Sequence, residues 1–341
     1  MGQSEQNRGA AIRKVLIFGL GSIGCRHAEV LLAMGGCAVA ACRTGRGGKD
    51  VPEALAERIT MFGDAEAAFA WRPDGVIVSN PTVLHPACTA AALDRGIDVL
   101  VEKPAGAELR DVEHLESKTV PGGPRAYVGY NLRFHPIVEA VKAAIDSGTY
   151  GRVLKADLYA GHWLPHWHRY EDYRTGYAAR KDLGGGVLRT LSHEVDLGQY
   201  WFGEYVHVLA RVAKVSDLEI DVDDTAEIVA ETQRCGVLKI SLDYLRPAYR
   251  RGGELFFEGG LLAYDFTRMR VELTDYDSGE TRTLAAVGGY DCNESYRRQM
   301  EAFLARSDDR ICTLKEGIEV MRVIDACEQS SVRREVMHVQ A

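Results

Sequence analysis

The sequence predicts an α/β domain built on a parallel sheet, followed by an α+β domain with a large, mostly antiparallel sheet. Two patterns predict this order. Near the N-terminus, short apolar runs alternate with helical patterns, which is typical of parallel strands covered on both faces. Beyond residue 150, long strand patterns follow one another across short turns, which favours antiparallel pairing. The length of 341 residues also exceeds what a single hydrophobic core usually reaches.

The first part of the chain contains the expected parallel strands. Apolar runs predict strands at residues 15–18, 38–42, 76–79 and 99–101. Helical patterns follow the first glycine turn and recur at residues 54–59, 65–70 and 86–95. The turn-rich segment 121–124 is Pro-Gly-Gly-Pro, a typical break between structural elements. We therefore predict a dinucleotide-binding type of domain at residues 1–121 and a second domain at residues 122–341.

The second part opens with a strand at 126–129 and a helix at 137–145. Further strands are expected at 153–159, 206–215, 226–233, 237–244, 255–258 and 269–274, with a helix at 193–202 between the first two of these long strands. Residues 314–330 carry a helical apolar stripe, which needs a partner surface. We expect this last helix to pack back on the first domain.

Composition excludes several classes of protein. Hydrophobic residues make up 46% of the chain and charged residues 26%, with a net charge of -8, so a nucleic-acid binder is not expected. The eight cysteines form no Cys-x-x-Cys pair, which predicts reduced thiols and no metal site. Residues 1–10 are polar, and no window reaches the ~20 apolar residues of a membrane span. We expect a cytoplasmic protein without a membrane or nucleic-acid partner.

A glycine-rich turn lies between the first predicted strand and the first predicted helix. Its pattern is Gly-x-Gly-x-x-Gly at residues 19–24, the fingerprint of a dinucleotide-binding turn in this context. The first glycine permits the tight turn, the second lets the backbone approach a pyrophosphate, and the third lets helix and strand pack closely. A glycine turn without a ligand is the alternative. The residues expected to bind the cofactor here are Gly19, Gly21, Ser22, Ile23 and Gly24.

The end of the second strand predicts which nicotinamide cofactor binds. NAD-binding domains usually carry an acidic residue there for the ribose 2′-hydroxyl. Residues 42–46 contain no carboxylate and instead offer Arg43, Thr44 and Arg46, which suit a 2′-phosphate. We therefore prefer NADP to NAD. The alternative is a solvated loop beside an NAD that lacks the acidic contact.

Two further motifs follow later strands. Asn80-Pro81-Thr82-x-x-His85 comes after the strand at 76–79, and Glu102-Lys103-Pro104 comes after the strand at 99–101. Ligands of open α/β sheets bind outside the carboxyl ends of the strands, so both motifs belong at the binding crevice. We expect cofactor contacts from Asn80, Pro81, His85 and Glu102. For His85, a local structural role at the start of the following helix is an equal alternative.

These motifs resemble those of the glucose–fructose oxidoreductase, inositol dehydrogenase and MocA family. The resemblance also includes residues 128–136, the glycine triplet at 184–186 and Ser192-His193-Glu194-x-Asp196, and it covers essentially the whole chain. It implies a Rossmann domain, hydride transfer at a sugar or cyclitol carbon, and a C-terminal sheet used to form a homodimer or homotetramer. Residues 167–174 and 191–194 are similar to a subgroup of bacterial surface-sugar and nonulosonate pathways.

The resemblance implies that Lys103 and His193 are the catalytic pair. An imidazole can exchange the hydroxyl proton near neutral pH, and an ammonium group stabilises negative charge on the same oxygen. One departure stands out, because many relatives carry an aspartate one helical turn before the histidine. The corresponding residue here is Thr190, with Arg189 beside it. Glu194 and Asp196 are the nearby carboxylates that could act as a rearranged partner.

The substrate is expected to contact aromatic and basic side chains. Residues 161–177 are rich in Trp, His and Tyr, which suit a sugar face or, alternatively, a subunit interface. A metal at His166 and His168 is not expected, and Arg133 has a structural ion pair as its alternative role. The predicted substrate contacts are Tyr130, Arg133, Trp163, His168, Arg174 and Thr190.

The sequence thus predicts an NAD(P)-dependent dehydrogenase or reductase. Its expected substrate is a sugar, an amino-sugar or a nucleotide-sugar. The alternative is a non-catalytic, dinucleotide-binding regulator of the same fold, which the missing aspartate favours and the presence of Lys103 and His193 disfavours.

Overall fold

The computed structural model describes residues 13–45, 50–167 and 172–339. The chain forms two compact units. The first contains residues up to 106, residues 110–131 and residues 292–317, and the second contains residues 107–109, 132–291 and those from 318 onward. The division at residue 121 and the packing of the last helix on the first domain stay predictions.

The first unit is built on a six-stranded sheet with the order β3-β2-β1-β4-β5-β6. All neighbouring strands in it are parallel. Its strands are β1 (Lys14–Phe18), β2 (Ala38–Cys42), β3 (Thr60–Phe62), β4 (Gly75–Val78), β5 (Asp98–Val101) and β6 (Ala126–Val128). The central strands are fully buried apolar runs, as in Leu16, Ile77 and Leu100, because a parallel sheet is usually covered on both faces.

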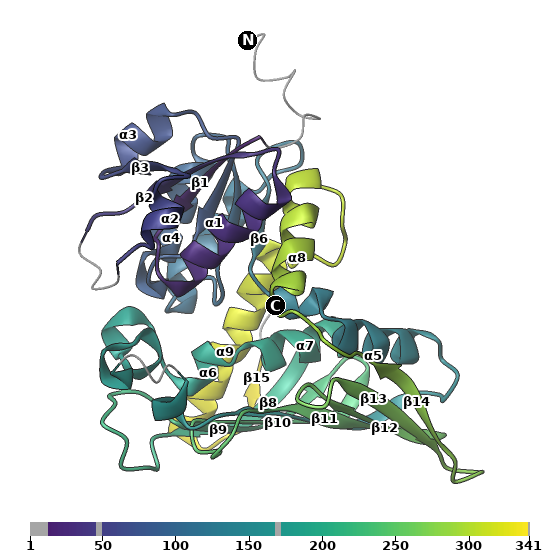
Figure 1. Cartoon of the computed structure of the whole chain (residues 1–341). Coiled ribbons are helices and arrows are strands. Elements are labelled where there is room, and N and C mark those ends of the chain that lie inside the picture. Colours follow the sequence, from purple (N-terminus) through teal and green to yellow (C-terminus); the bar gives the residue numbers. More distant parts are fainter. Residues whose placement is uncertain (1–12, 46–49, 168–171, 340–341) are drawn as a thin grey trace. The chain divides into compact units, whose positions relative to one another are not determined.

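The helices of the first unit are α1 (Ser22–Met34), α2 (Glu53–Ala56), α3 (Ala65–Ala70), α4 (His85–Leu93) and α8 (Asn293–Ala305). Helix α1 packs on β1 and β2, and α4 packs on β4 and β5. Helix α8 comes from a distant part of the sequence yet lies beside α1 (Figure 1). The first unit therefore includes a segment that the N-terminal third of the chain does not supply.

The second unit contains a nine-stranded sheet with the order β14-β13-β12-β11-β7-β10-β9-β8-β15. Its strands are β7 (Val153–Gly161), β8 (Tyr205–Ala213), β9 (Thr225–Thr232), β10 (Cys235–Asp243), β11 (Arg250–Phe257), β12 (Gly260–Asp265), β13 (Arg270–Asp275), β14 (Thr281–Ala286) and β15 (Met337–His338). Strands β7 and β10 are parallel, whereas the other neighbouring pairs are antiparallel. The predicted fold class is confirmed.

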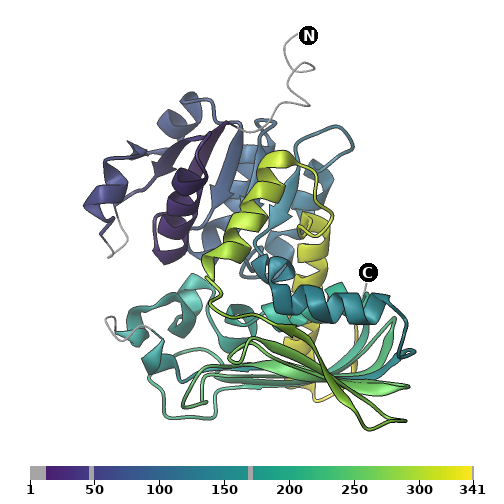
Figure 2. The same ribbon diagram turned by 45° about the vertical axis from the view of Figure 1, so that its right-hand side comes forward.

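Helices lie along one face of this sheet. They are α5 (Pro136–Asp146), α6 (Val187–Thr190) and α7 (His193–Phe202), while α9 (Leu314–Arg333) enters the unit at Ile318. Helix α5 packs on β12, β13 and β14, and α7 packs on β7, β9 and β10. Figure 2 shows the opposite face without a covering helix in the described part of the chain.

The strand sequences explain which face is covered. In β9, Ala226, Ile228 and Ala230 are buried, whereas Glu227 and Val229 between them are exposed. This alternation follows from the two-residue period of a strand. The buried set faces the helices, and the exposed set forms the open face.

Several elements escaped prediction because their sequences lack a clear apolar pattern. Strand β14 is largely exposed. Helix α8 buries Met300 and Phe303 but carries ion pairs of Arg297 with Glu294 and Glu301 on its other side, so polar residues dominate its sequence. Strands β3 and β12 and the short helix α6 were also missed. No helix in the described ranges is long and apolar enough to cross a membrane.

Candidate functional site

The glycine turn between β1 and α1 leaves no room for a side chain at Gly19 or Gly24, whereas space is open at Gly21. Gly19 has a φ of +91°, and a Cβ atom there would lie 2.7 Å from the Cα of Asn80. A Cβ on Gly24 would lie 2.0 Å from the carbonyl oxygen of Gly19. Glycine is therefore required at both positions, because any side chain would collide with backbone. The turn is closed against the end of β4.

The same turn leaves the first turn of α1 open to an anion. The residue before the helix, Gly21, provides no side-chain cap, and no acidic residue lies in the first turn. The first backbone N–H groups of a helix have no partner within the helix and favour negative charge. These residues fit a dinucleotide pyrophosphate, and the individual cofactor contacts stay a prediction.

Arg43 and Thr44 follow β2 directly. The backbone N–H of Arg43 donates to the carbonyl of Phe62 at 2.9 Å, which extends the pairing of β2 with β3. The Thr44 residue is exposed and Arg43 is half-buried. Arg46, the other basic residue of this loop, lies outside the described residues.

The end of β4 presents Asn80. Its amide nitrogen donates to the Cys88 sulfur at 3.2 Å. Its carbonyl oxygen Oδ1 is buried and has no hydrogen-bond partner within the ranges that the structure covers. A buried acceptor without a donor is costly, so this oxygen fits a role in holding a bound cofactor.

His85 is held between two turns rather than directed to open space. Its Nδ1 lies 2.9 Å from the carbonyl oxygen of Pro104, and its Nε2 lies 2.9 Å from the carbonyl oxygen of Asn80. Burial lowers the pKa of this histidine, although the two carbonyl contacts oppose that shift. Both ring nitrogens face backbone, which favours the local structural role over a cofactor contact. The cofactor role stays a prediction.

The Glu102-Lys103-Pro104 turn follows β5, and its Lys103–Pro104 peptide bond is cis. Burial tends to raise the pKa of Glu102, but a hydrogen bond with His27 and the charge of Lys103 lower it overall. Glu102 is therefore an ionised carboxylate beside Lys103. Because β1, β4 and β5 are parallel neighbours, the glycine turn, Asn80 and Lys103 lie at the same edge of the sheet.

His193 begins α7 in the second unit and is buried. Both carboxylates near it in sequence are ion-paired with arginines. Asp196 binds Arg133, with Oδ1 2.7 Å from Nη2, and Glu194 binds Arg251, with Oε1 2.7 Å from Nε. These four side chains are almost fully buried.

Thr190, which replaces the aspartate of many relatives, is buried at the end of α6. The Tyr244 hydroxyl donates to the carbonyl of Ala178 at 3.3 Å, and burial raises the pKa of Tyr244 well above the ordinary value while Thr190 opposes this rise. The neighbouring Arg189 turns to Glu328, with Nη2 2.9 Å from Oε2, and to the carbonyl of Ala107 at 2.9 Å. These contacts indicate a structural role for Arg189.

Asp223 is a carboxylate near this segment that sequence patterns did not identify. It accepts a hydrogen bond from the backbone N–H of Leu188 at 2.9 Å. Burial raises its pKa, and the charge of Arg189 and backbone hydrogen bonds oppose this. Asp223 lies 35 residues along the chain from Leu188, so no local motif signals its position.

The remaining predicted substrate residues have mixed environments. Arg133 is fully buried, with its guanidinium also 4.8 Å above the ring of Tyr200, which favours its structural alternative. Arg174 is exposed and ion-paired with Asp172 and Glu219.

Tyr130 is buried in the first unit. The backbone N–H of Trp163 donates to the carbonyl of Arg246 at 2.6 Å, and Trp163 is half-buried. His168 lies outside the described residues. Substrate contacts by these residues stay predictions.

Known proteins resemble the chain over nearly its full length. Inositol 2-dehydrogenase 2 of Saccharopolyspora erythraea is 27% identical over 92% of this chain and 91% of its own. D-xylose 1-dehydrogenase (NADP(+)) 2 of Haloferax volcanii is 26% identical over 80% of this chain and 82% of its own. The solved structure of levoglucosan dehydrogenase with NADH and levoglucosan has the same fold, with a TM-score of 0.85 at 17% identity, covering 96% of this chain and all of that one.

Models of one protein family match two successive parts of the chain. Residues 13–130 match the oxidoreductase family with an NAD-binding Rossmann fold, and residues 138–262 match the GFO/IDH/MocA C-terminal domain. Together these parts make up more than half of the sequence. The chain therefore belongs to the GFO/IDH/MocA family of oxidoreductases.

Proposed function

We propose that this protein transfers hydride between a nicotinamide cofactor and a hydroxyl-bearing carbon of a sugar or cyclitol. The observation that carries the proposal is the position of Lys103. It follows β5, at the sheet edge where the glycine turn and the open N-terminus of α1 fit a dinucleotide. A lysine at this edge stands where a reacting oxygen beside the nicotinamide needs a positive charge.

In this proposal, Lys103 and His193 divide the acid–base work. A nicotinamide held at this sheet end would supply the hydride acceptor or donor. His193 takes the hydroxyl proton during oxidation and returns it during reduction. Lys103 stabilises the negative charge that develops on the same oxygen. Thr190 replaces a third acidic group, so the protein carries out this chemistry without an aspartate at that position.

We further propose that NADP is preferred to NAD. The absence of a carboxylate at residues 42–46, together with Arg43 and Thr44 after β2, supports this preference. The name of the Haloferax volcanii relative includes NADP(+), whereas the levoglucosan dehydrogenase structure contains NADH. The relatives thus do not decide the cofactor, and the preference rests on this chain's own residues.

The substrate is proposed to be a small polyhydroxylated molecule. The relatives are named for inositol, D-xylose and levoglucosan, which all carry secondary hydroxyl groups on a ring. We propose that this class includes amino-sugars and nucleotide-sugars, and that substrate contacts come from Tyr130, Trp163, His168, Arg174 and Thr190. Arg133, which is buried and paired with Asp196, is assigned the structural role instead. The cytoplasm is the expected site of the reaction.

One experiment tests both the proposed activity and the proposed preference for NADP. Purified protein is titrated with NADPH and with NADH, and turnover is then followed at the nicotinamide absorbance with myo-inositol, D-xylose, levoglucosan, amino-sugars and nucleotide-sugars. We expect tighter binding of NADPH and turnover of at least one substrate. Lys103→Met and His193→Ala should each lower kcat by about 10²–10⁴-fold.

Matched surface changes serve as controls. Lys118→Met and His114→Ala alter the same residue types at outer positions of the first unit and should leave kcat unchanged. Undiminished turnover in the Lys103 and His193 variants would refute their catalytic roles. Tight cofactor binding without turnover of any substrate would instead favour the non-catalytic regulator, the alternative that Thr190 supports.

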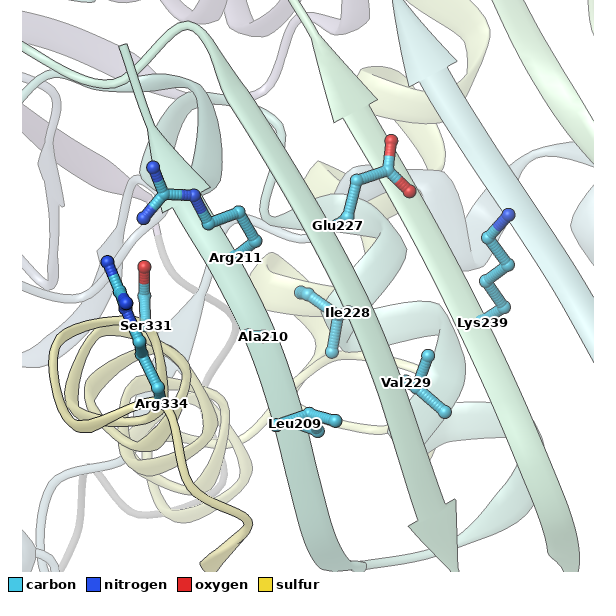
Figure 3. Close-up of a pocket in the computed structure, with 9 residues that line it drawn as sticks. All are labelled: Leu209, Ala210, Arg211, Glu227, Ile228, Val229, Lys239, Ser331 and Arg334. Carbon is cyan, nitrogen blue, oxygen red and sulfur yellow. The ribbon is translucent and has the colours of Figure 1, made fainter. Parts of the chain in front are cut away.

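We also propose that the open face of the large sheet joins two copies of the chain. Leu209 on β8 and Val229 on β9 are register partners, and their exposed fractions are 45% and 48%. Figure 3 shows the hollow around them, with charged side chains rising from neighbouring strands and from the end of α9. Its basic residues are Arg211, Lys239 and Arg334, and its acidic residue is Glu227.

The exposed apolar side chains suit a second copy as the occupant. In a two-fold dimer the same patch meets itself, so Glu227 of each copy can approach one of the partner's three basic side chains. The exposed apolar side chains between them would be buried by such an association. Burial of these apolar side chains therefore supports a homodimer or a homotetramer assembled from such dimers.

A further inference from the structure

A buried histidine on the cofactor-binding helix contacts the turn that carries Lys103. His27 lies in α1 and has no exposed surface, and its Nε2 lies 2.7 Å from Oε1 of Glu102. The two residues are 75 positions apart in the sequence. A buried carboxylate is stable only when it is paired or hydrogen-bonded. His27 therefore supplies a contact that Glu102 needs to remain ionised.

Glu102 is fixed from two other directions. Its second oxygen, Oε2, accepts a hydrogen bond from the backbone N–H of Lys103 at 3.2 Å. Its carboxylate also lies against Gly129, where a Cβ atom would be 3.1 Å from each carboxylate atom. The side chain thus has little freedom to move, and the backbone of Lys103 is tied to it.

The ring of His27 is held in turn by its surroundings. It lies edge-on to the ring of Tyr296 from α8, with centroids 5.7 Å apart. The guanidinium of Arg26 lies 5.1 Å from the centre of the same tyrosine ring. Helix α8 therefore supports the histidine ring through Tyr296.

The hydrogen-bond pattern fixes the proton on the His27 ring. A carboxylate only accepts hydrogen bonds, so Nε2 must carry the proton and donate it. Nδ1 is buried and has no partner among the described residues.

We propose that His27 is a positioning residue for Lys103. It holds the Glu102 carboxylate, which holds the Lys103 backbone, and it does so from α1, the helix whose N-terminus fits the cofactor phosphates. The position of the lysine and the position of the cofactor phosphates therefore both depend on helix α1. His27 itself touches neither substrate nor reacting atoms. This inference rests on the proposed function, because it assigns a role in the placement of its proposed catalytic lysine.

The test compares His27→Leu, which removes the donor, with His27→Gln, which retains an N–H that can reach Glu102. Displacement of a catalytic group by about 1 Å costs on the order of 10²-fold in rate. We expect kcat to fall by about 10- to 100-fold in His27→Leu, with the cofactor Kd and the substrate KM changed by less than about threefold. His27→Gln should recover most of the lost rate.

Hydrogen exchange of the Lys103 amide gives a second readout. This amide donates directly to Glu102, and the next residue, Pro104, has no amide. Exchange at Lys103 should therefore become faster in His27→Leu while exchange in β1 and β4 stays as in the wild type. Unchanged exchange at Lys103 in both variants, or an unchanged kcat in His27→Leu, would overturn the proposal.

A matched control separates positioning from general destabilisation. His135→Leu also removes a buried histidine, but in the second unit, so it should leave Lys103 exchange unchanged. If the wild-type protein turns over no substrate, the proposed function fails, and the exchange comparison alone decides the inference. If His27→Leu does not fold, His27→Gln and Glu102→Gln are compared instead, and only Glu102→Gln should accelerate Lys103 exchange strongly.

Discussion

At the scale of single residues, His135 is a buried histidine whose chemistry is set by its neighbours. Its ring lies 4.5 Å from the rings of both Phe266 and Tyr290, measured between centroids. Its Nδ1 accepts a hydrogen bond from the backbone N–H of Ile137 at 3.2 Å, which caps α5. Burial, aided by the charge of Arg251, lowers the pKa of His135 to about 4. The folded protein therefore keeps this ring neutral.

This lowered pKa predicts a loss of stability in acid. The unfolded chain binds the proton near pH 6.5, whereas the folded chain binds it near pH 4, so stability falls as the pH drops through that window. His135 should account for about 2 kcal/mol of the loss between pH 7 and pH 4.5. The measurement is urea unfolding of wild type and His135→Leu at both pH values. An equal loss in the two proteins would contradict the assignment.

His27, Glu102 and Asp223 mark what residue patterns cannot reveal. The Glu-Lys-Pro turn and the Gly-x-Gly-x-x-Gly turn are local strings, so their place after β5 and β1 follows from the order of strands. His27, the partner of Glu102, is 75 residues away from it in the sequence. Asp223, which binds the N-terminus of α6 at Leu188, is 35 residues away from that residue. Such contacts are products of the tertiary fold, and no local spacing encodes them.

At the scale of elements, α7 is fixed by two buried ion pairs near its start. Arg133 comes from the segment before α5 and binds Asp196, while Arg251 comes from β11 and binds Glu194. Glu194 lies one position and Asp196 three positions after His193. The two ion pairs therefore set the rotation of the helix that carries His193. The sequence placed α7 correctly, but it left the role of Arg133 open between substrate contact and structural pair.

Replacing one member of such an ion pair should lower the free energy of unfolding strongly, whereas replacing both members should lower it much less. Arg133→Met leaves the buried Asp196 without its cation and should lower the free energy of unfolding by about 3–5 kcal/mol. Arg133→Met combined with Asp196→Leu removes both charges and should recover most of that loss. Urea unfolding followed by Trp201, which is buried in α7, measures both. A double variant no more stable than the single one would argue against the pairing as the cause.

The elements that could be predicted differ in kind from those that could not. Strands β1, β4 and β5 are continuous apolar runs because both of their faces are buried, and β9 alternates because one face is open. Strand β14 and helix α8 gain much of their stability from neighbours rather than from an apolar pattern of their own. The parallel pairing of β7 with β10 was also not predicted, because a strand pattern does not specify its neighbour or direction.

At the scale of the whole molecule, the open sheet face is the surface through which we propose that copies of the chain associate. Helices cover the opposite face of the sheet, and the hollow around Leu209 and Val229 combines apolar side chains with charges of both signs. A sheet face of this kind is more readily explained by an interface than by contact with water. The wild-type protein is accordingly expected to sediment as a dimer or tetramer.

Val229→Lys should break this association. Residue 229 is the register partner of Lys239, so the introduced ammonium group meets a like charge, and two-fold symmetry places it at the interface of both copies. We expect the dimer Kd to rise on the order of a hundredfold or more, because each buried, unpaired charge costs several kcal/mol. Val120→Lys, at an exposed apolar residue of the first unit, is the control and should leave the mass unchanged. Sedimentation velocity over a range of protein concentrations measures both, and a wild-type protein that stays monomeric throughout would exclude this face as a stable interface.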